Sequence, residues 1–206
     1  MKNSTFNPQE QELHLSSKVV AGLERISEVF KVLLWEQATA IGLSPIQIQI
    51  LIFVAYHKPN LCNVSHLARE FNITKPTVSD AIRVLENKEL IRKHQSSEDR
   101  RSYSIELTNQ GQEIVGQTGH FSSPLLLQVH QLKSEELEGL WHSLSRLIHK
   151  LNRSGILTVQ RTCFGCTYYL ARNNGPDYCK LLKKDLHTAD IRLDCPEYED
   201  QGSGIR

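Results

Sequence analysis

Hydrophobic residues recur every three to four positions over much of the chain, which is the spacing of amphipathic helices. The helices predicted from this spacing cover residues 8–40, 46–56, 64–71, 108–129 and 134–152. We expect Gly42 to end the first of them and Ser44 with Pro45 to open the second. We also expect Pro124 to kink the helix that contains it, because proline cannot donate the backbone hydrogen bond.

A further helix, which begins at Thr74, has two chemically different faces. Thr74 is a suitable N-cap, and Pro76 fits the first turn, where its missing N–H is not needed. Val78, Ile82 and Leu85 form an apolar stripe. The opposite side carries short polar groups and cations, namely Lys75, Thr77, Ser79, Asp80 and Arg83. Such a face can enter the major groove of DNA, although an ordinary solvated surface helix shows the same pattern.

Two short runs with alternating apolar positions, residues 91–96 and 102–107, predict a β-hairpin after this helix. The loop between them contains Arg100 and Arg101 and is too polar to be buried. A basic hairpin tip beside a recognition helix can reach the flanking minor groove of DNA. Asp99 is expected to shape this tip through an ion pair with Arg101. The order of helix, strand, charged loop, strand and helix is that of a winged helix-turn-helix.

This region resembles the MarR family of bacterial regulators, and the resemblance covers roughly residues 10–152. It rests on three features. The first is a helix end of the form LxxLExKxLIxR at Ile82–Arg92, and the second is the basic tip Asp99-Arg100-Arg101. The third is the start of the next helix, with Leu107-Thr108 and Gly111. The resemblance implies a sequence-specific transcription factor, mostly a repressor, that binds double-stranded DNA near its own promoter. Release of DNA on a ligand or an oxidant is implied too, but the small-molecule effector is not specified.

The first helix and the last two carry more apolar residues than one winged helix is expected to cover. In the family resembled, the N- and C-terminal helices interlock two subunits into a homodimer. A two-fold dimer places its recognition helices about 34–36 Å apart, one turn of DNA, and therefore reads a near-palindromic operator. The alternative is that these helices complete the core of a monomer.

Charge and targeting signals narrow the class of protein. The 206 residues carry a net charge of +1, and residues 72–101 hold seven Lys and Arg against five acidic residues. Phosphate affinity must therefore come from placement and from dimerisation. The chain has no apolar run long enough to span a membrane and no signal-peptide pattern at its start. We expect a cytoplasmic protein without a membrane partner.

Four of the five cysteines lie near the end of the chain with the spacing C-x2-C-x12-C-x15-C, at Cys163, Cys166, Cys179 and Cys195. Clustered cysteines in a cytosolic protein indicate metal or redox chemistry, since disulfide frameworks are rare there. The C-x2-C pair places two sulfurs within one turn, close enough to grip one ion or one edge of a cluster.

Three interpretations of this module stay open. An iron–sulfur cluster tolerates loose ligand spacing, and its last cysteine is often followed by proline, as in Cys195-Pro196. A structural zinc is almost as well supported, because a small module gains folding free energy from metal binding. The cysteines could also be unligated or form a thiol switch. His187 is not assigned as a ligand, since a lone histidine in such a stretch is more often a surface residue.

Cys62 stands apart from the others, at a position where the short first strand of the wing sheet is expected. We interpret it as a small buried residue, with an oxidisable sensor as the minor alternative. Patterns typical of enzymes, such as GxSxG, a P-loop or HExxH, are missing from the sequence, and its histidines are scattered. The sequence therefore predicts a non-enzymatic regulator.

The expected fold is mainly α with a small β-wing, divided into four regions. These are an N-terminal dimerisation helix, a winged helix-turn-helix, C-terminal dimerisation helices and a cysteine-ligated metal module, at residues 1–40, 41–111, 112–154 and 155–206. The predicted function is a MarR-type regulator that senses redox or iron status through its four-cysteine centre. The alternative is a metal-thiolate redox or protein-interaction module whose winged helix contacts protein.

Overall fold

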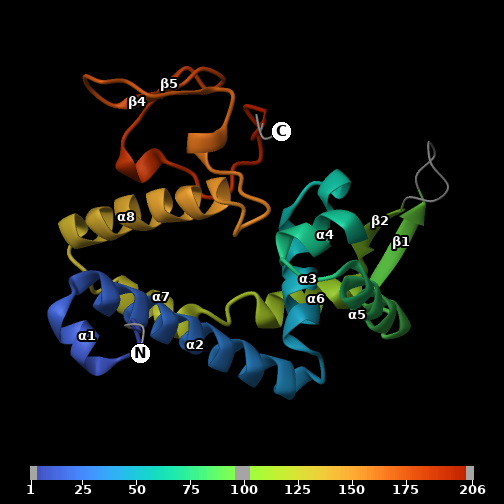
Figure 1. Cartoon of the computed structure of the whole chain (residues 1–206). Helices are drawn as coiled ribbons and strands as arrows, with labels where there is room; N and C mark the ends of the chain where they lie inside the picture. Colours follow the sequence, from blue (N-terminus) through green and yellow to red (C-terminus); the bar gives the residue numbers. More distant parts are fainter. Residues whose placement is uncertain (1–3, 96–102, 203–206) are drawn as a thin grey trace.

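The computed structural model describes residues 4–95 and 103–202, and it is mainly helical with two small sheets (Figure 1). The helices and strands up to the last long helix are α1 Pro8–Leu13, α2 Leu15–Ile41, α3 Pro45–Tyr56, α4 Val64–Glu70, α5 Lys75–Asn87, β1 Ile91–Gln95, β2 Tyr103–Leu107, α6 Asn109–Thr118, α7 Ser123–Val129 and α8 Ser134–Arg153. The short elements are η1 Pro59–Leu61, η2 Cys163–Gly165, β3 Tyr169–Leu170, β4 Asp177–Cys179, β5 Lys184–Leu186 and η3 Thr188–Asp190. The mainly α fold with small sheets confirms the expected fold class at this level.

The winged helix is built around α3, whose apolar residues lie on all of its sides. Helices α4, α5 and α6 and the β1–β2 hairpin pack around it (Figure 1). The fully buried side chains of this core include Ile48, Ile50, Leu51, Leu67, Val78, Ile82, Leu85 and Ile105. Burial of such side chains is the main favourable contribution to the stability of a domain.

The predicted helix ends are confirmed by their local geometry. Gly42 ends α2 with a left-handed backbone, φ 66°. The N–H of Ser44 donates to Oε1 of Gln47 at 2.8 Å and so closes a capping box at the start of α3. Thr74 caps α5 as expected, since its hydroxyl oxygen accepts the N–H of Thr77 at 3.3 Å.

The wing is an antiparallel pair in which Ile91 lies opposite Leu107. Its tip, which includes Asp99, Arg100 and Arg101, lies outside the described residues. At the base of the wing, the backbone of α6 runs so close to Leu90 that a Cβ on Gly111 would lie 2.0 Å from the carbonyl oxygen of Leu90. Only glycine fits there without moving one of the two chains.

Three sequence predictions need correction. Residues 8–40 form two helices, because His14 leaves the helical region with φ −131° and ψ 116°. Residues 108–129 also form two helices rather than one kinked helix. Gly119 caps the end of α6, and Pro124, which lacks an N–H, sits in the first turn of α7. The strand expected at Cys62 is a 3-10 turn begun by Pro59, and only the carbonyl of Cys62 joins the sheet, as acceptor for the N–H of Ile105 at 2.8 Å.

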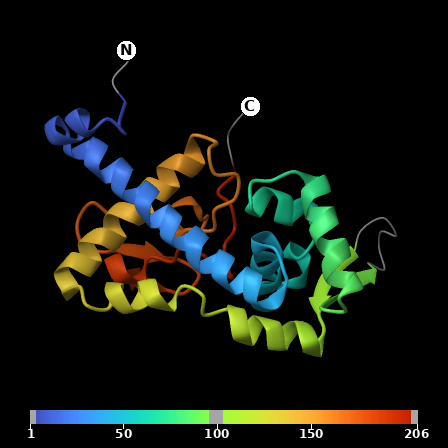
Figure 2. The same ribbon diagram turned by 90° about the horizontal axis from the view of Figure 1, so that it is seen from below.

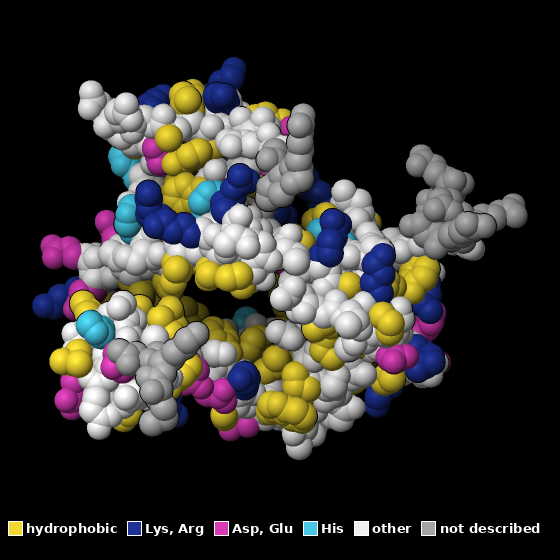
Figure 3. All heavy atoms as spheres, in the orientation of Figure 1, with side chains coloured by type: hydrophobic (Ala, Val, Ile, Leu, Met, Phe, Trp, Pro, Cys, Tyr) yellow, Lys and Arg dark blue, Asp and Glu magenta, His cyan; other side chains and the backbone are white. Residues whose placement is uncertain are grey.

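Helices α2, α7 and α8 lie to one side of the winged helix, with α8 above α2 and at an angle to it (Figures 1 and 2). Hydrophobic side chains are exposed along the lower edge of α8 and on the helices beneath it (Figure 3). The exposed ones include Leu15, Val19, Leu23, Ile26, Phe30 and Trp35 of α2, Leu126 and Leu127 of α7, and Leu137, Leu140 and Leu147 of α8. Among the described residues, no single helix meets the length and apolarity needed to cross a membrane, and α2 with α3 meets them only as a pair bent by 93°.

The C-terminal module is a three-stranded antiparallel sheet with order β3-β4-β5, flanked by 3-10 turns. Its small core contains Cys163, Leu186 and Ile191, against which Trp141 of α8 packs. The indole N–H of Trp141 donates to the carbonyl oxygen of Thr188 at 3.0 Å. Through this contact the module is attached to α8.

Candidate nucleic-acid interface and cysteine cluster

Helix α5 separates its two faces as the sequence suggested. Val78, Ile82 and Leu85 have no solvent exposure. The five side chains of the opposite face, Lys75, Thr77, Ser79, Asp80 and Arg83, are all exposed. The apolar face of α5 is fixed in the core, and its exposed face carries short polar and cationic groups. Such a helix has the shape and the hydrogen-bonding groups that a DNA groove accepts.

Arg83 is not free on this face, because its guanidinium donates to the carboxylate of Asp80 at 2.7 Å. Both side chains are about two-thirds exposed, at 69% and 68%. An exposed pair of this kind contributes little to stability. Its effect is to restrain the guanidinium, which keeps further N–H groups that can donate to another acceptor.

Much of the positive charge near α5 is already paired. Arg92 on β1 lies 3.1 Å from Glu106, and Lys93 lies 2.6 Å from Glu86. Of the cations between residues 72 and 95, all of which the structure describes, Lys75 and Lys88 have no ion-pair partner. Lys75 stands in the first turn of α5, where the helix end also attracts phosphate.

The winged helix has a counterpart among known families: the model of the MarR family matches residues 41–102. The matched segment includes α3, α4, α5 and β1. Residues 41–102 are thus similar to the MarR family and share its winged-helix fold. No curated protein matches the chain in sequence.

Solved structures agree with this MarR-type fold. The S. aureus MepR–DNA complex is 26% identical, with a TM-score of 0.57, over 64% of this chain and 97% of that chain. S. aureus MepR in its DNA-binding conformation is 25% identical, with a TM-score of 0.58, over 65% and 98%. Streptococcus pneumoniae FabT in complex with DNA, at 21% identity, a TM-score of 0.53 and coverage of 65% and 97%, shows likeness of fold alone.

The four C-terminal cysteines come from separate segments of the C-terminal module. Cys163 and Cys166 share a tight turn in which the N–H of Cys166 donates to the carbonyl of Cys163 at 3.0 Å. Cys179 ends β4, opposite Tyr169 of β3. Cys195 follows the sheet, and its N–H donates to the carbonyl oxygen of Arg161 at 3.0 Å.

The fold brings these four thiols into one neighbourhood around Cys163. Burial raises the pKa of Cys163, and negative charge on Cys195, Cys179 and Cys166 raises it further. The backbone N–H of Arg192 donates to Sγ of Cys163 at 3.2 Å, and its guanidinium lies 3.6 Å from Sγ of Cys195. Such N–H groups favour thiolate over thiol.

The four cysteine thiols have the chemistry of metal ligands but are not arranged as a metal site. Cysteine sulfurs with N–H donors behind them suit zinc or an iron–sulfur cluster. Across residues 4–95 and 103–202, however, no three His, Cys, Asp or Glu side chains stand in an arrangement that could hold a metal ion. The sulfurs are gathered but do not form a closed ligand set, and the metal module stays a prediction.

Cys62 has the surroundings of a packing residue. Its side chain is 1% exposed, and its thiol donates to the carbonyl of Lys58 at 3.4 Å. Burial raises the pKa of this thiol to about 11. A thiol that stays protonated is a poor nucleophile, and this supports the interpretation of Cys62 as a small buried side chain.

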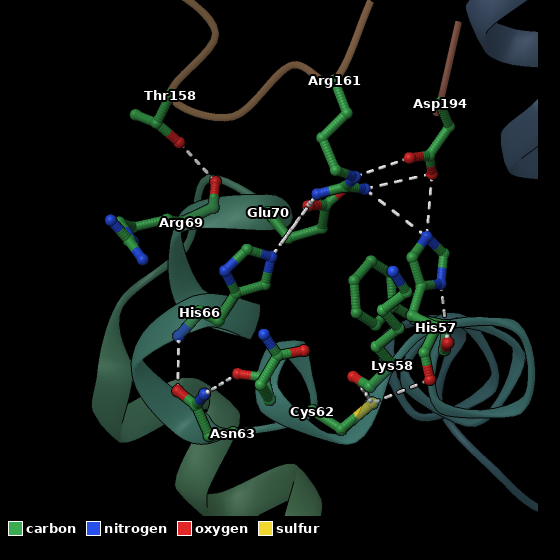
Figure 4. A network of polar contacts seen from close by, with 12 residues as sticks. His57, Lys58, Cys62, Asn63, His66, Arg69, Glu70, Thr158, Arg161 and Asp194 are labelled. Carbon is green, nitrogen blue, oxygen red and sulfur yellow. Dashed lines mark hydrogen bonds and ion pairs between the residues drawn. The ribbon is translucent and has the colours of Figure 1, made fainter. Parts of the chain in front are cut away.

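Sequence reasoning missed the place where the cysteine module meets the winged helix (Figure 4). Arg161 lies there among Glu70, Asp194, His57 and His66. A cavity of about 1180 Å³ opens beside this cluster, between α4 and the module. Pairing between residues this far apart in the sequence leaves no periodic pattern. The sequence hinted at this cluster only through the position of Arg161 and Asp194 beside cysteines.

Proposed function

We propose that the protein is a MarR-type transcriptional regulator that binds double-stranded DNA as a homodimer and acts as a repressor in the cytoplasm. The observation that carries the proposal is the exposed polar and cationic face of α5, held by a fully buried apolar back. The likeness to MepR in a DNA complex, at 26% identity, supports the same assignment.

The residues of α5 suit different parts of DNA recognition. Lys75, unpaired at the start of the helix, is placed to contact phosphate, which fixes the register of the protein on the duplex. Thr77 and Ser79 offer hydroxyls that can serve as donor or acceptor to either base of a pair. Arg83, oriented by Asp80, is the group best suited to bidentate contact with guanine.

The outer helices supply a surface for a second copy of the chain. Leu15 and Trp35 of α2 are 76% and 60% exposed, and Leu127 of α7 is 62% exposed. Contiguous apolar surface of this kind marks a protein interface. A two-fold arrangement through these helices would present two α5 helices to one face of DNA.

We further propose that Cys163, Cys166, Cys179 and Cys195 would hold an iron–sulfur cluster or zinc, and that this centre adjusts DNA binding to redox or iron status. The support is the gathering of four thiols around a buried Cys163, whose sulfur accepts the backbone N–H of Arg192. When bound, such a centre would supply electron transfer in the first case and a structural cross-link in the second.

Fluorescence anisotropy of a labelled mixed-sequence duplex tests the DNA-binding function. We expect affinity to fall steeply with salt, because binding releases counterions from phosphates, and Lys75→Ala should weaken binding and flatten this salt dependence by about one phosphate contact. Lys180→Ala, which removes an exposed lysine of the cysteine module, is the matched control and should behave as wild type. Salt-independent binding, or equal effects of both variants, would overturn the proposal.

A further inference from the structure

Arg161 is a buried arginine that holds two carboxylates at once. Its side chain is only 11% exposed. Its two terminal nitrogens donate to the two oxygens of Glu70 at 2.8 and 3.1 Å. Its Nε and one terminal nitrogen donate to Asp194 at 2.5 and 3.0 Å. Both contacts are bidentate, which is the strongest and most directional form of this ion pair.

The surroundings fix the plane of this guanidinium (Figure 4). It lies 5.6 Å from the centre of the Phe53 ring, on which His57 stacks at 3.7 Å. Nε2 of His57 lies 2.8 Å from Asp194, and Nε2 of His66 lies 3.4 Å from Glu70. Groups from α3, α4 and the cysteine module therefore meet at one arginine.

The cluster stands between the cysteines and the reading helix. On the module side, the carbonyl of Arg161 accepts the N–H of Cys195, and Arg161 lies two residues before Cys163. On the other side, Glu70 is the last residue of α4, and α5 begins at Lys75. A second contact adjoins the first, because the hydroxyl of Thr158 donates to the carbonyl of Arg69.

Loss of Arg161 would leave Glu70, whose side chain is only 20% exposed, without the partner that compensates its charge, whereas Asp194, at 44% exposed, is screened by solvent. Breaking a buried ion pair on one side is much more disruptive than breaking an exposed pair, because the remaining charge is uncompensated. Lysine cannot replace the arginine fully, since a single ammonium cannot make two bidentate contacts. The junction is therefore sensitive to small movements of the segments that carry Cys163 and Cys195.

We propose that Arg161 is a positioning residue for the DNA-reading unit, which ties α4, and through it α5, to the cysteine segments. This proposal rests on the proposed function, because only that function makes α5 a DNA-reading helix. The contacts of Arg161 with Glu70 and Asp194 do not depend on it. A change in the cysteine cluster that moves residues 161–163 or 194–195 is transmitted to the reading helix at Glu70.

Hydrogen exchange of the full-length protein tests the junction without DNA. Arg161→Ala should speed exchange of the amides in α4 by about tenfold, and Arg161→Lys should have a smaller effect. Arg172→Ala is the matched control. Arg172 also pairs with a carboxylate, Asp185 at 2.9 Å, and lies 4.4 Å from the ring of Tyr178, but all three are within the module. Unchanged exchange in α4 of the Arg161→Ala protein would overturn the proposal.

A double-mutant cycle with Cys163→Ser tests transmission, using the same exchange measurement. If Arg161 is the link, Cys163→Ser speeds exchange in α4 when Arg161 is present and adds nothing when it is alanine. Equal effects of Cys163→Ser in both backgrounds would show that the cysteines do not act through Arg161. Affinity for duplex DNA, measured on the same four proteins, should follow the same non-additive pattern. Absence of DNA binding by all four would refute the proposed function while the exchange data still decide the role of Arg161.

Discussion

The carboxylate of Glu70 and the guanidinium of Arg161 are joined by two hydrogen bonds, of 2.8 and 3.1 Å, across 91 residues of sequence. Glu70 belongs to the helix before the recognition helix, whereas Arg161 belongs to the segment that leads into the cysteine cluster. The two parts of the chain are therefore in direct contact through a part-buried ion pair. Under our proposal, a movement of the cysteine segments is transmitted through Arg161 and Glu70 to α5, the helix that we assign to DNA binding.

The stability of the protein should fall on mild acidification. Burial lowers the pKa of His66 below its ordinary value of 6.5, with Arg161 and Arg69 acting in the same direction and Glu70 opposing them. The pKa of His149 is lowered too, by burial and then by Arg153 and Arg146. The folded protein thus takes up fewer protons than the unfolded chain, so stability is lost as pH drops through about 6.5 towards the lowered values. Urea unfolding at about pH 7.5 and about pH 5.5 measures this difference.

Substitution of Arg161 should change the titration of His66 in a defined direction. Removal of the nearby positive charge in Arg161→Ala leaves Glu70 as the dominant charge, so the pKa of His66 should rise. The ring resonances of His66 in an NMR titration report this pKa directly. His149 lies on α8, and Arg161 does not contribute to the shift of its pKa, so it serves as the internal control. A His66 pKa that stays the same would show that the two side chains are not neighbours in solution.

The junction between the wing and α6 should tolerate only glycine at position 111. In Gly111→Ala the new methyl would meet the backbone oxygen of Leu90, so we expect a loss of about 3 kcal/mol in the free energy of unfolding. Gly116→Ala is the control in the same helix, where a Cβ meets nothing within 4 Å, and it should be neutral or stabilising by up to about 1 kcal/mol. Thermal and chemical denaturation compare the two; similar stabilities would contradict the close approach described here.

The dimer should depend on the exposed apolar edge of α8. Leu140 is 43% exposed in the single chain, so Leu140→Asp is tolerable in a monomer but would place an unpaired charge in the proposed interface. Sedimentation should show a folded monomer for this variant and a dimer for wild type. Gly139→Asp adds the same carboxylate one residue earlier, about 100° around the helix from Leu140 and so off the apolar edge, and should remain dimeric. A wild-type protein that is monomeric at micromolar concentration would refute this interface.

If the proposed metal centre exists, metal content should separate the cysteines into two groups. Cys163→Ser should lose most of the bound metal, because three thiolates seldom hold zinc or a cluster with the original affinity. Cys62→Ser should keep it, since Cys62 is buried in the winged helix. Metal analysis and visible absorbance of anaerobically purified protein measure both. Equal metal content in the two variants would exclude the C-terminal cysteines as the binding site.

The features that could be predicted from sequence are those with a local cause. The caps of α3 and α5 depend on residues within a few positions, and the buried stripe from Val78 to Leu85 follows from helical spacing alone. The break at His14 went unseen because one non-helical residue does not disturb the apolar period on either side. The prediction of a strand at Cys62 was wrong because Pro59 begins a 3-10 turn there.

The junction at Arg161 lies beyond such reasoning for a physical reason. Its partners Glu70 and Asp194 belong to segments that meet only after the whole chain has folded. From sequence alone, a charged residue in a polar stretch is predicted to be solvent-exposed unless its partner is known. The cysteine spacing did single out the module, but the spacing alone could not say how the sulfurs stand relative to one another.

Selection of binding sites from random duplex DNA tests the central claim most directly. With wild type we predict recovery of a near-palindromic site whose half-sites lie about 34–36 Å apart, centre to centre. Arg83→Ala should recover a site with relaxed preference at one position of each half, a loss of about 1–3 kcal/mol in discrimination. Failure of the wild-type protein to enrich any duplex, or recovery of the same preferences by Arg83→Ala, would contradict DNA reading by α5.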